Sequence, residues 1–354
     1  MRYQFPFRAL IAVCIVLFGM NALAQDLAPN LLSWAGPLNY DRGEQTSVAI
    51  APMSNFIIEF HKSQNNSTMW YHTGTISGTR GGIIVGWGAS HSLETTGAWP
   101  AVAVTREGYV ILVSSPAGQV VSQIRYSVGK INPSGAVDQT ITWYRTNQVF
   151  GYGYHASISV NSLGRIALAY ECRNACIPAL DYRLGHLENP ASGQYNIVWE
   201  TGANAIAYDK GVNPHIAIND SDQVIEVHQV DAREQLLHYR RGNLNSDSIS
   251  FQKSTRYDNN AKDPAVTLTN SGQVIALDIK KDAVSARTGN LDAGNPATVD
   301  WSESANIGSL GYNVYNVYPA VTNSGTVVLA TWTVNDGSII GPYGTLQYSV
   351  APLN

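Results

Sequence analysis

The chain has 354 residues, of which only 14% are charged, and its formal net charge at pH 7 is −4. It contains no arginine-rich run or basic patch, which excludes the electrostatic footprint of a nucleic-acid-binding protein. Gly, Asn, Ser, Thr and Tyr are plentiful, a composition typical of an extracellular all-β domain with many tight turns.

Residues 1–24 have the pattern of a secretory signal peptide. Arg2 and Arg8 precede an apolar run, and a small-x-small tripeptide, Ala-Leu-Ala, ends the segment. A membrane anchor is the weaker interpretation, because the apolar run is too short to span a bilayer comfortably. Cleavage leaves one domain, residues 25–354, with 20 of the 22 basic residues against 26 acidic ones. We therefore expect a secreted or periplasmic protein that is a monomer and is not inserted in the membrane.

The rest of the chain is a repeat. A motif of the form L-x-Y-x-x-G-x-L recurs six times, centred on Tyr71, Tyr126, Tyr182, Tyr239, Ala286 and Tyr348. Two β runs around a polar turn precede each copy, which is the pattern of a hairpin. A short run ending in an aromatic residue follows the first five copies, at Trp87, Trp143, Trp199, Phe251 and Trp301. Each repeat therefore predicts four strands.

The sixth repeat lacks its fourth strand, because the sequence ends at Asn354. A matching run, LLSW at residues 31–34, lies before the first repeat and is similar to the run around Trp143. An N-terminal strand that completes the last repeat indicates a closed ring without a free edge. We predict an all-β, six-bladed β-propeller of four-stranded antiparallel blades, with both faces of each sheet buried. A β-solenoid explains neither the four-strand unit nor the displaced run.

Two repeats carry the same polar residues. The complete sets are Tyr40, Asp41, Glu59 and His61 in the first repeat, and Tyr208, Asp209, Glu226 and His228 in the fourth. A Glu and a His two residues apart on a strand point to the same face. We place each Tyr-Asp pair in the loop that enters its repeat, and each Glu-x-His pair at the end of the second strand. The fifth repeat keeps Tyr257 and Asp258 but has Ala276 and Asp278 at the other two positions.

The sets have two interpretations that the residues leave open. One is structural, because WD-repeat propellers use a hydrogen-bonded chain containing Asp and His within a blade, and Asp41 with His61 resembles part of it. The other is a carbohydrate site, because carboxylates accept hydrogen bonds from vicinal hydroxyls and aromatic rings pack on the C–H face of a sugar. Catalysis or metal binding is the weaker alternative, and no cofactor or metal is expected. The first and fourth repeats lie opposite one another in a six-fold ring, so they cannot share one site.

The two cysteines that remain after cleavage, Cys172 and Cys176, lie in the segment ECRNACIP. In an oxidising compartment we expect them to form a local disulfide that pins one loop. A metal or redox pair is the alternative, but the CxxxC spacing is not that of a zinc ribbon, and the sequence has no second pair.

The segment AVDQTITW, residues 136–143, resembles the Asp-box of bacterial sialidases and related six-bladed propellers, S-x-D-x-G-x-T-W. Asp138, Thr142 and Trp143 match the box, whereas Ala136 and Thr140 depart from it. In that family the box is a structural turn on the face away from catalysis, so the resemblance implies the fold and carries no activity.

Sialidase chemistry requires an arginine triad, a Tyr-Glu pair and an Asp acid, and an Arg-Ile-Pro element opens the family domain. The mature sequence has no such element, and its arginines are scattered. The sequence therefore favours a lectin-like propeller that binds carbohydrate or another cell-surface ligand at repeated sites. A sialidase-like glycoside hydrolase and a protein-interaction scaffold of the cell envelope are the alternatives.

Overall fold

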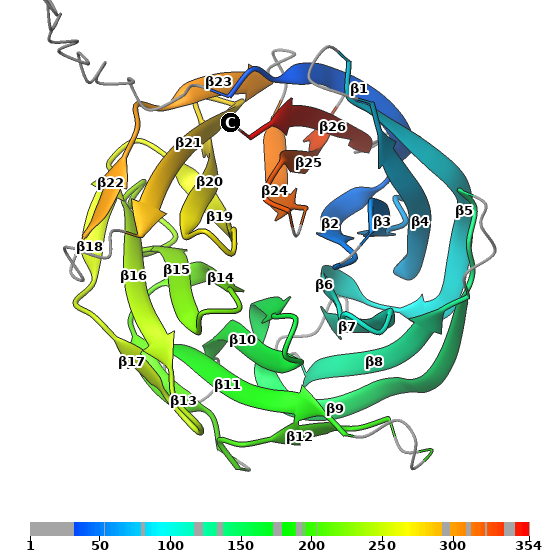
Figure 1. Ribbon diagram of the computed structural model, residues 1–354, viewed down its shortest axis with the longest axis horizontal. Coiled ribbons are helices and arrows are strands. Elements are labelled where there is room, and N and C mark those ends of the chain that lie inside the picture. The colour runs from blue at the N-terminus through cyan, green and yellow to red at the C-terminus, as the bar shows by residue number, and fades with distance from the viewer. Residues whose placement is uncertain are drawn as a thin grey trace, which may run out of the picture.

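The computed structural model describes residues 32–353 except for 53, 79–81, 117–122, 133–136, 173–178, 189–192, 194, 203, 292–297, 309–312, 323 and 336–343. The regular elements of these residues are β-strands, and their sheets are arranged as a propeller around a central axis (Figure 1). Within the same residues, no helix is long and apolar enough to span a membrane. The protein is therefore an all-β propeller, as the repeats predict.

The strands of each repeat follow one another outward from the axis, in the meander that the repeats predict (Figure 1). The innermost strands are β2 (Glu44–Ile50), β6 (Ala98–Val104), β14 (Val212–Ile218), β19 (Lys262–Leu268) and β24 (Val314–Val321), with the second part of β9 (Ile141–Val160). The second strands are β3 (Phe56–Lys62), β7 (Tyr109–Ser115), β10 (Arg165–Cys172), β15 (Gln223–Gln229), β20 (Gln273–Lys280) and β25 (Val327–Asn335). The third strands are β4 (Thr68–Ser77), β8 (Gln123–Ile131), β11 (Ala179–Leu187), β16 (Leu237–Leu244), β21 (Ala283–Leu291) and β26 (Gly344–Pro352).

The outermost strands are of two kinds. Three of the outer positions are filled by continuous strands, namely β5 (Ile84–Thr96), the first part of β9 and the N-terminal strand β1 (Ala35–Arg42). The others are split into two short strands each, namely β12 (Ile197–Trp199) with β13 (Ile206–Asp209), β17 (Ile249–Phe251) with β18 (Thr255–Asp258), and β22 (Val299–Trp301) with β23 (Ala305–Gly308).

Within the described residues, hydrogen bonds divide the strands into four separate sheets of four or five strands and one sheet of eight. In the largest sheet, β9 pairs with β8 through residues 141–152 and with β10 through residues 153–160. The prediction that every repeat forms a separate sheet is therefore wrong at β9. A Cβ at Gly153 would lie 2.2 Å from the carbonyl oxygen of Glu171. Only glycine allows the chain to pass so close to β10 on its way from the rim to the centre.

The last sheet is completed by the N-terminal strand, since β1 pairs antiparallel with β26. The predicted position of this strand, residues 31–34, is wrong: residues 32–34 form no strand, and residue 31 lies outside the described part. Trp34 instead packs against the buried cluster that contains Trp332. The split outer strands explain why the N-terminal strand begins later than predicted. In a split outer strand the second short piece, such as β18, follows the aromatic run of its repeat, and β1 occupies the place of this second piece.

The sheets are buried on both faces, as the near-continuous apolar runs predict. Ile57 and Ile58 are adjacent on β3 and point to opposite faces, yet both are fully buried. Ile58 belongs to the hydrophobic cluster of Val110, in the next sheet, and Ile57 to the cluster of Leu329, in the last sheet. Each aliphatic side chain buried in this way stabilises the fold by roughly 1.5–3 kcal/mol.

Some predicted features lie outside the described residues. Cys172 is the last residue of β10, but its predicted disulfide partner, Cys176, is not among the residues described. The same holds for the predicted signal peptide, residues 1–24. The disulfide and the signal peptide therefore stay predictions.

Candidate functional site

The first predicted set forms a chain of buried hydrogen bonds. Glu59 is fully buried, and its carboxylate accepts from the hydroxyl of Thr46 at 2.8 Å and from Nδ1 of His61 at 3.1 Å. The hydroxyl oxygen of Tyr40 lies 3.1 Å from that of Thr46, and Asp41 lies 3.7 Å from Nε2 of His61. Burial and the neighbouring Glu59 carboxylate raise the pKa of Tyr40 well above its ordinary value. The phenol therefore stays protonated and can donate.

The second predicted set repeats this chain with one link fewer. Glu226 is fully buried and accepts directly from the hydroxyl of Tyr208 at 2.9 Å and from Nδ1 of His228 at 3.0 Å. Pro214 stands at the repeat position of Thr46 and has no hydroxyl to intervene. Asp209 lies 3.7 Å from Nε2 of His228. Burial, followed by the charge of Glu226, raises the pKa of Tyr208 well above its ordinary value.

A residue on the third strand distinguishes the two sets. In the strand pairing, His72 of β4 lies opposite the Glu of the first set, and Arg240 of β16 lies opposite the Glu of the second. Nε2 of His72 lies 2.7 Å from Oδ2 of Asp41, whereas Nε of Arg240 donates to Oδ2 of Asp209 at 2.6 Å. The sequence motifs did not include this position, although it recurs at the same offset from each Tyr motif.

These partners control the charge of the two aspartates. Burial is the largest single effect and would raise the pKa of Asp41, but the hydrogen bonds from His72 and from the backbone of Arg42, with the nearby histidines, together lower it. Burial would likewise raise the pKa of Asp209, but hydrogen bonds from the backbone of Lys210 and from Arg240 lower it. The pKa of His72 shifts the other way: burial is the largest effect and would lower it, but the bond to Asp41, the charge of Glu59 and the bond to the backbone of Gly88 together raise it. Both aspartates are therefore ionised at neutral pH.

The structure brings each predicted set together, but not where the sequence placed its parts. The Tyr-Asp pairs lie in β1 and β13 rather than in loops, because these strands pair with β26 and β11. Each pair belongs to the sheet before the one that carries its Glu-x-His pair, so each set joins two sheets. The Glu and His side chains are at most 2% exposed, while Asp41 and Asp209 are 30% and 18% exposed.

The incomplete set of the fifth repeat fills the same space with a different ion pair. Arg287 lies opposite Ala276 on the third strand, and its guanidinium contacts Asp258. Asp278 takes the position of His228, is fully buried, and lies 3.5 Å from Nη2 of Arg287. Burial raises the pKa of Asp278 to about 7, although the positive charge of Arg287 opposes this shift.

The segment that resembles an Asp-box joins two neighbouring repeats. Asp138 lies 2.6 Å from Nε2 of His91 on β5. The hydroxyl of Thr73 donates to the carbonyl of Val137 at 2.9 Å and accepts from the backbone N–H of Gln139 at 2.8 Å. The first residue of the segment lies outside the described part. These contacts tie the segment to β4 and β5 of the preceding repeat.

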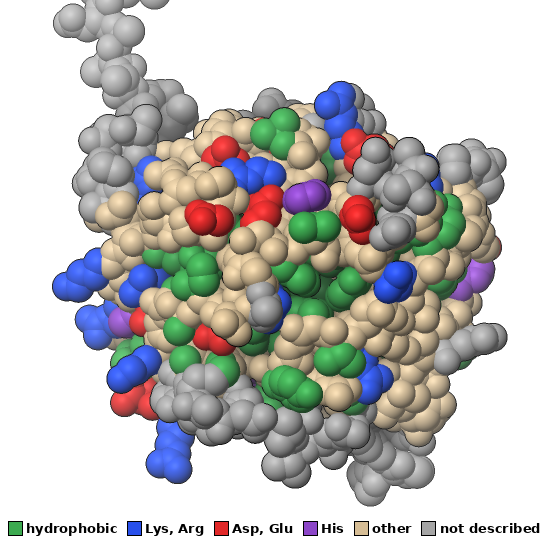
Figure 2. Space-filling view, turned by 90° about the horizontal axis from the view of Figure 1, so that it is seen from below, with side chains coloured by type: hydrophobic (Ala, Val, Ile, Leu, Met, Phe, Trp, Pro, Cys, Tyr) green, Lys and Arg blue, Asp and Glu red, His purple; other side chains and the backbone are tan. Residues whose placement is uncertain are grey.

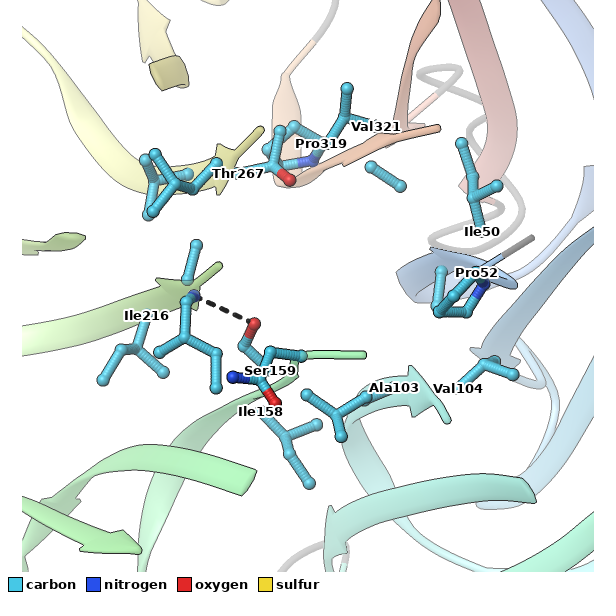
Figure 3. A pocket seen from close by; sticks show the side chains of 18 of the residues that line it. Ile50, Pro52, Ala103, Val104, Ile158, Ser159, Ile216, Thr267, Pro319 and Val321 are labelled. Atoms are coloured by element: carbon cyan, nitrogen blue, oxygen red, sulfur yellow. Dashed lines mark hydrogen bonds between the residues drawn. The ribbon is translucent and has the colours of Figure 1, made fainter. Parts of the chain in front are cut away.

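A channel runs along the axis between the innermost strands, lined largely by small and aliphatic side chains such as Ile50, Ala103 and Ile216 (Figure 3). Each innermost strand is bulged near the end where it enters the channel. The bulged residue has a φ between 46° and 58° in each case, and these residues are Gln45, Trp99, His155, Asn213, Asp263 and Asn316. We call these six residues the mouth ring.

The backbone of the mouth ring is strained. A positive φ costs a residue other than glycine roughly 1–2 kcal/mol, and bulges are a means of re-aiming side chains. Strained positions of this kind cluster at functional sites. Because the strain recurs at one position of the repeat while the side chain changes, the ring is a second candidate site.

Five of the six mouth-ring residues, all except Gln45, line a pocket whose polar groups are held in place. Asn213 donates through Nδ2 to Asp263 at 2.7 Å. Nδ1 of His155 donates to the buried carboxylate of Glu171 at 2.6 Å, and the Trp99 ring packs edge-on against the His155 ring at 4.2 Å. Burial raises the pKa of Asp263. An amide, a carboxylate, an imidazole and an indole thus share one mouth.

His215 lies beneath the ring and lines both the mouth pocket and the channel. It is 8% exposed, and burial lowers its pKa to about 3, so the imidazole is neutral. The backbone N–H of Val266 donates to Nδ1 at 3.3 Å, which places the ring proton on Nε2. That Nε2–H has no hydrogen-bond partner among the described residues. A buried donor without a partner is costly, so this N–H is an unsatisfied group at the base of the mouth pocket.

Comparisons with known proteins identify the fold. No family model matches the chain, and no curated protein matches it. A structure of a protein of unknown function from Dyadobacter fermentans is 11% identical, with 90% of this chain and 96% of that one covered and a TM-score of 0.54. An aldose sugar dehydrogenase from Streptomyces coelicolor is 10% identical, with 91% and 99% covered and a TM-score of 0.50. The hemagglutinin-neuraminidase ectodomain of parainfluenza virus 5 is 8% identical, with 92% and 84% covered and a TM-score of 0.52. These likenesses concern the fold alone.

Proposed function

We propose that this protein is a secreted propeller that binds carbohydrate, and that the channel mouth is its glycan site. The observation that carries the proposal is the mouth ring, in which strained bulges direct a mixed group of polar and aromatic side chains into one pocket. Below them, His215 offers a neutral, buried N–H donor without a partner in the described structure.

The chemistry of the mouth suits an uncharged, polyhydroxylated ligand. Asn213 and Asp263 offer donors and acceptors side by side, as adjacent sugar hydroxyls require. Trp99 is a partly exposed indole at the same rim, and aromatic rings of this kind pack against the C–H face of a sugar. Figure 2, turned by 90° from the view down the ring, shows the side of the molecule, where acidic and basic side chains lie with hydrophobic ones between them.

The proposal includes the organisation of the ring and its location. Dividing the eight-stranded sheet at β9 gives six blades, with one mouth-ring residue on each innermost strand. Secretion of residues 25–354 as a monomer, with a disulfide between Cys172 and Cys176, completes the proposal. Of the fold neighbours, one is described as an aldose sugar dehydrogenase and one as a hemagglutinin-neuraminidase, and such names agree with a sugar ligand.

Ligand contact by the two Tyr-Asp and Glu-x-His sets stays a prediction. Asp41 and Asp209 are far more accessible than the buried Glu and His side chains, so a ligand would meet these carboxylates before them. The buried Glu and His side chains would hold the aspartates in position and would not touch the ligand.

The test is a glycan array followed by titration calorimetry of the glycans that bind. We expect Trp99→Ala and Asp263→Asn each to weaken binding at least about tenfold, a change of roughly 1.4 kcal/mol. Tyr152→Ala and Asp138→Asn are the matched controls, because they remove an exposed aromatic ring and an exposed carboxylate away from the mouth. An array without binding, or equal affinities in all four variants, would contradict the proposal.

Glycoside cleavage is the second candidate, because the raised pKa of Asp263 suits a proton donor. It predicts that the glycans bound at the mouth are hydrolysed and that Asp263→Asn abolishes hydrolysis while leaving measurable binding. Binding without turnover by the wild-type protein would leave the lectin-like function alone.

A further inference from the structure

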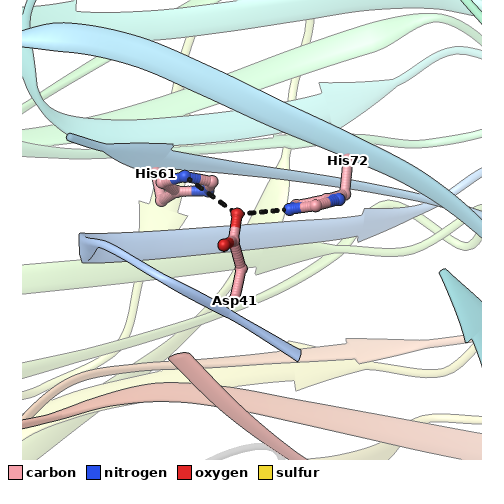
Figure 4. A group of neighbouring side chains, drawn as sticks. All are labelled: Asp41, His61 and His72. Atoms are coloured by element: carbon pink, nitrogen blue, oxygen red, sulfur yellow. Dashed lines mark hydrogen bonds and ion pairs between the residues drawn. The ribbon is translucent and has the colours of Figure 1, made fainter. Parts of the chain in front are cut away.

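The first set contains a group of side chains that the carbohydrate proposal does not use. Nε2 of His61, Nε2 of His72 and Oδ2 of Asp41 converge, and these three atoms lie within 4.8 Å of one another (Figure 4). The distances from Asp41 Oδ2 are 2.7 Å to His72 and 3.7 Å to His61. The histidines come from β3 and β4, and the aspartate comes from β1 in the neighbouring sheet.

The other nitrogen of each ring has its own partner. Nδ1 of His61 donates to Oε2 of Glu59 at 3.1 Å, and Nδ1 of His72 donates to the carbonyl oxygen of Gly88 at 3.0 Å. With the Glu59 and Gly88 oxygens as the acceptors of these two bonds, each Nδ1 of a neutral ring carries the hydrogen and each Nε2 has a lone pair. Two lone pairs and the Asp41 carboxylate therefore face one another. Metal-binding histidines show this arrangement, with the second nitrogen held by a carboxylate or a backbone carbonyl.

The dimensions agree with a metal ion. Bonds of about 2.0–2.2 Å in a tetrahedral site put neighbouring ligand atoms roughly 3.4 Å apart. The two distances from Asp41 fall on either side of that value. The histidines are almost fully buried, while Asp41 is 30% exposed, so a fourth position would open toward solvent. Imidazole and carboxylate together suit zinc and its neighbours, whereas calcium and magnesium prefer oxygen ligands.

We propose that Asp41, His61 and His72 bind one divalent transition-metal ion of the zinc class, with an open coordination position on the Asp41 side. The site is distinct from the channel mouth, and it holds whether or not the mouth binds glycans.

The fourth repeat supplies an internal comparison. Asp209 and His228 repeat the positions of Asp41 and His61, but Arg240 replaces His72. A guanidinium has no lone pair and stays protonated, so it cannot bind a metal. In the fifth repeat, Arg287 takes the same place beside Asp258. The fold thus puts a fixed positive charge next to this aspartate in two repeats and a histidine in the first, where a cation can supply the charge.

The test uses the full mature protein, stripped of metal and titrated with Co²⁺ at pH 7.5. We expect one equivalent to bind with the visible absorption bands of a four-coordinate ion, and Zn²⁺ to displace it and raise the melting temperature. His72→Arg copies the fourth repeat and should keep the fold, and it should weaken metal binding at least about 100-fold. Asp41→Asn, which keeps the shape of the side chain, should also weaken binding.

Two further variants make the result decisive. His91→Gln removes a more exposed histidine that also neighbours an aspartate, and it should leave metal binding unchanged. Arg240→His builds the missing ligand in the fourth repeat and should raise the stoichiometry from one to two. Absence of the absorption bands in the wild type would overturn the proposal, because His72 would then be only a protonated partner of Asp41. Equal metal binding by His72→Arg and the wild type would overturn it as well.

Discussion

The first and fourth repeats bury the same Glu-x-His pair, yet they surround it differently. In the first repeat, the phenol of Tyr40 reaches toward the glutamate through Thr46, and the nearby aspartate faces His72. In the fourth, Tyr208 donates to the glutamate directly, and Arg240 holds the aspartate.

The difference shows which parts of the motif are fixed and which are free. The glutamate and its histidine must stay paired, because both are cut off from water and each satisfies the other. The third-strand position requires a positive charge beside the aspartate, and it obtains this charge from Arg240 in one repeat. In the first repeat, the neutral His72 ring carries no charge, so a proton or a metal ion must supply it. A structural device in the fourth repeat is thus a candidate binding site in the first.

Removal of the buried glutamate has the largest expected effect. Glu226→Ala leaves the Tyr208 hydroxyl and Nδ1 of His228 buried without an acceptor, and we expect the free energy of unfolding to fall by about 3–5 kcal/mol. Glu59→Ala should cost less, because the Thr46 hydroxyl it frees lies 3.4 Å from that of Thr331, a second acceptor. Urea unfolding followed by tryptophan fluorescence measures both changes.

The control for the glutamate variants is Glu200→Ala, which removes a partly exposed carboxylate paired with His186. It should change the free energy of unfolding by less than about 1 kcal/mol. A loss below 1 kcal/mol for Glu226→Ala would mean that the pair is not a buried structural element.

Only some of the residues that form the two sets could be predicted from the sequence. The spacing of Tyr, Asp, Glu and His was visible because the same letters recur at the same offsets in two repeats. The third-strand partner was not, since His72 and Arg240 share no letter and only the strand pairing reveals their equivalence. The location of the Tyr-Asp pairs was mistaken for a similar reason. Whether a segment is a loop or an edge strand depends on its neighbour, here β26 and β11.

The sequence did not reveal the mouth ring, because its residues share a backbone conformation and not a residue type. Its residues differ in chemistry, and a positive φ leaves no direct mark on a sequence when the residue is not glycine. A weak signal exists in the repeat alignment, since Pro follows Trp99, Asn213 and Asp263 at the start of the inner strand. The propeller itself was predictable, because its strands repeat at regular spacing and bury both faces, which leaves continuous apolar runs.

The second prediction concerns pH and compares His228 with Asp278, which occupies the same position in the fifth repeat. The pKa of Asp278 is raised to about 7 in the folded protein, mainly by burial, against about 3.8 when unfolded. The folded state therefore holds one more proton between these values, and stability falls as pH rises through this window, by up to about 1.4 kcal/mol per pH unit. For His228, burial is the largest effect and would lower the pKa, but the charge and hydrogen bond of Glu226 and the charge of Asp209 together raise it above 6.5, so its loss of stability begins only as that of Asp278 nears its end.

Asp278→Asn isolates the contribution of that carboxyl group. The variant should match the wild type near pH 3, below the unfolded pKa, and should be increasingly more stable than it as the pH rises to 7.5, because a neutral amide removes the buried charge. Urea unfolding at several pH values measures the difference, with exposed Asp247→Asn as the control. A difference between Asp278→Asn and the wild type that does not grow with pH would show that Arg287 keeps this carboxyl ionised throughout.

The smallest expected effect is the difference in stability loss between Tyr208→Phe and Tyr40→Phe. Tyr208→Phe removes a hydrogen bond made directly to the buried Glu226, and we expect a loss of about 1.5–2 kcal/mol in the free energy of unfolding. Tyr40→Phe should cost about 0.5–1 kcal/mol, because Thr46 still donates to Glu59 at 2.8 Å. The double variant Tyr40→Phe/Thr46→Val removes that donor and should bring the loss in the first repeat to at least that of Tyr208→Phe. Equal losses in the two single variants would show that the intervening hydroxyl does not insulate Glu59, and the two repeats would then be alike except at the third strand.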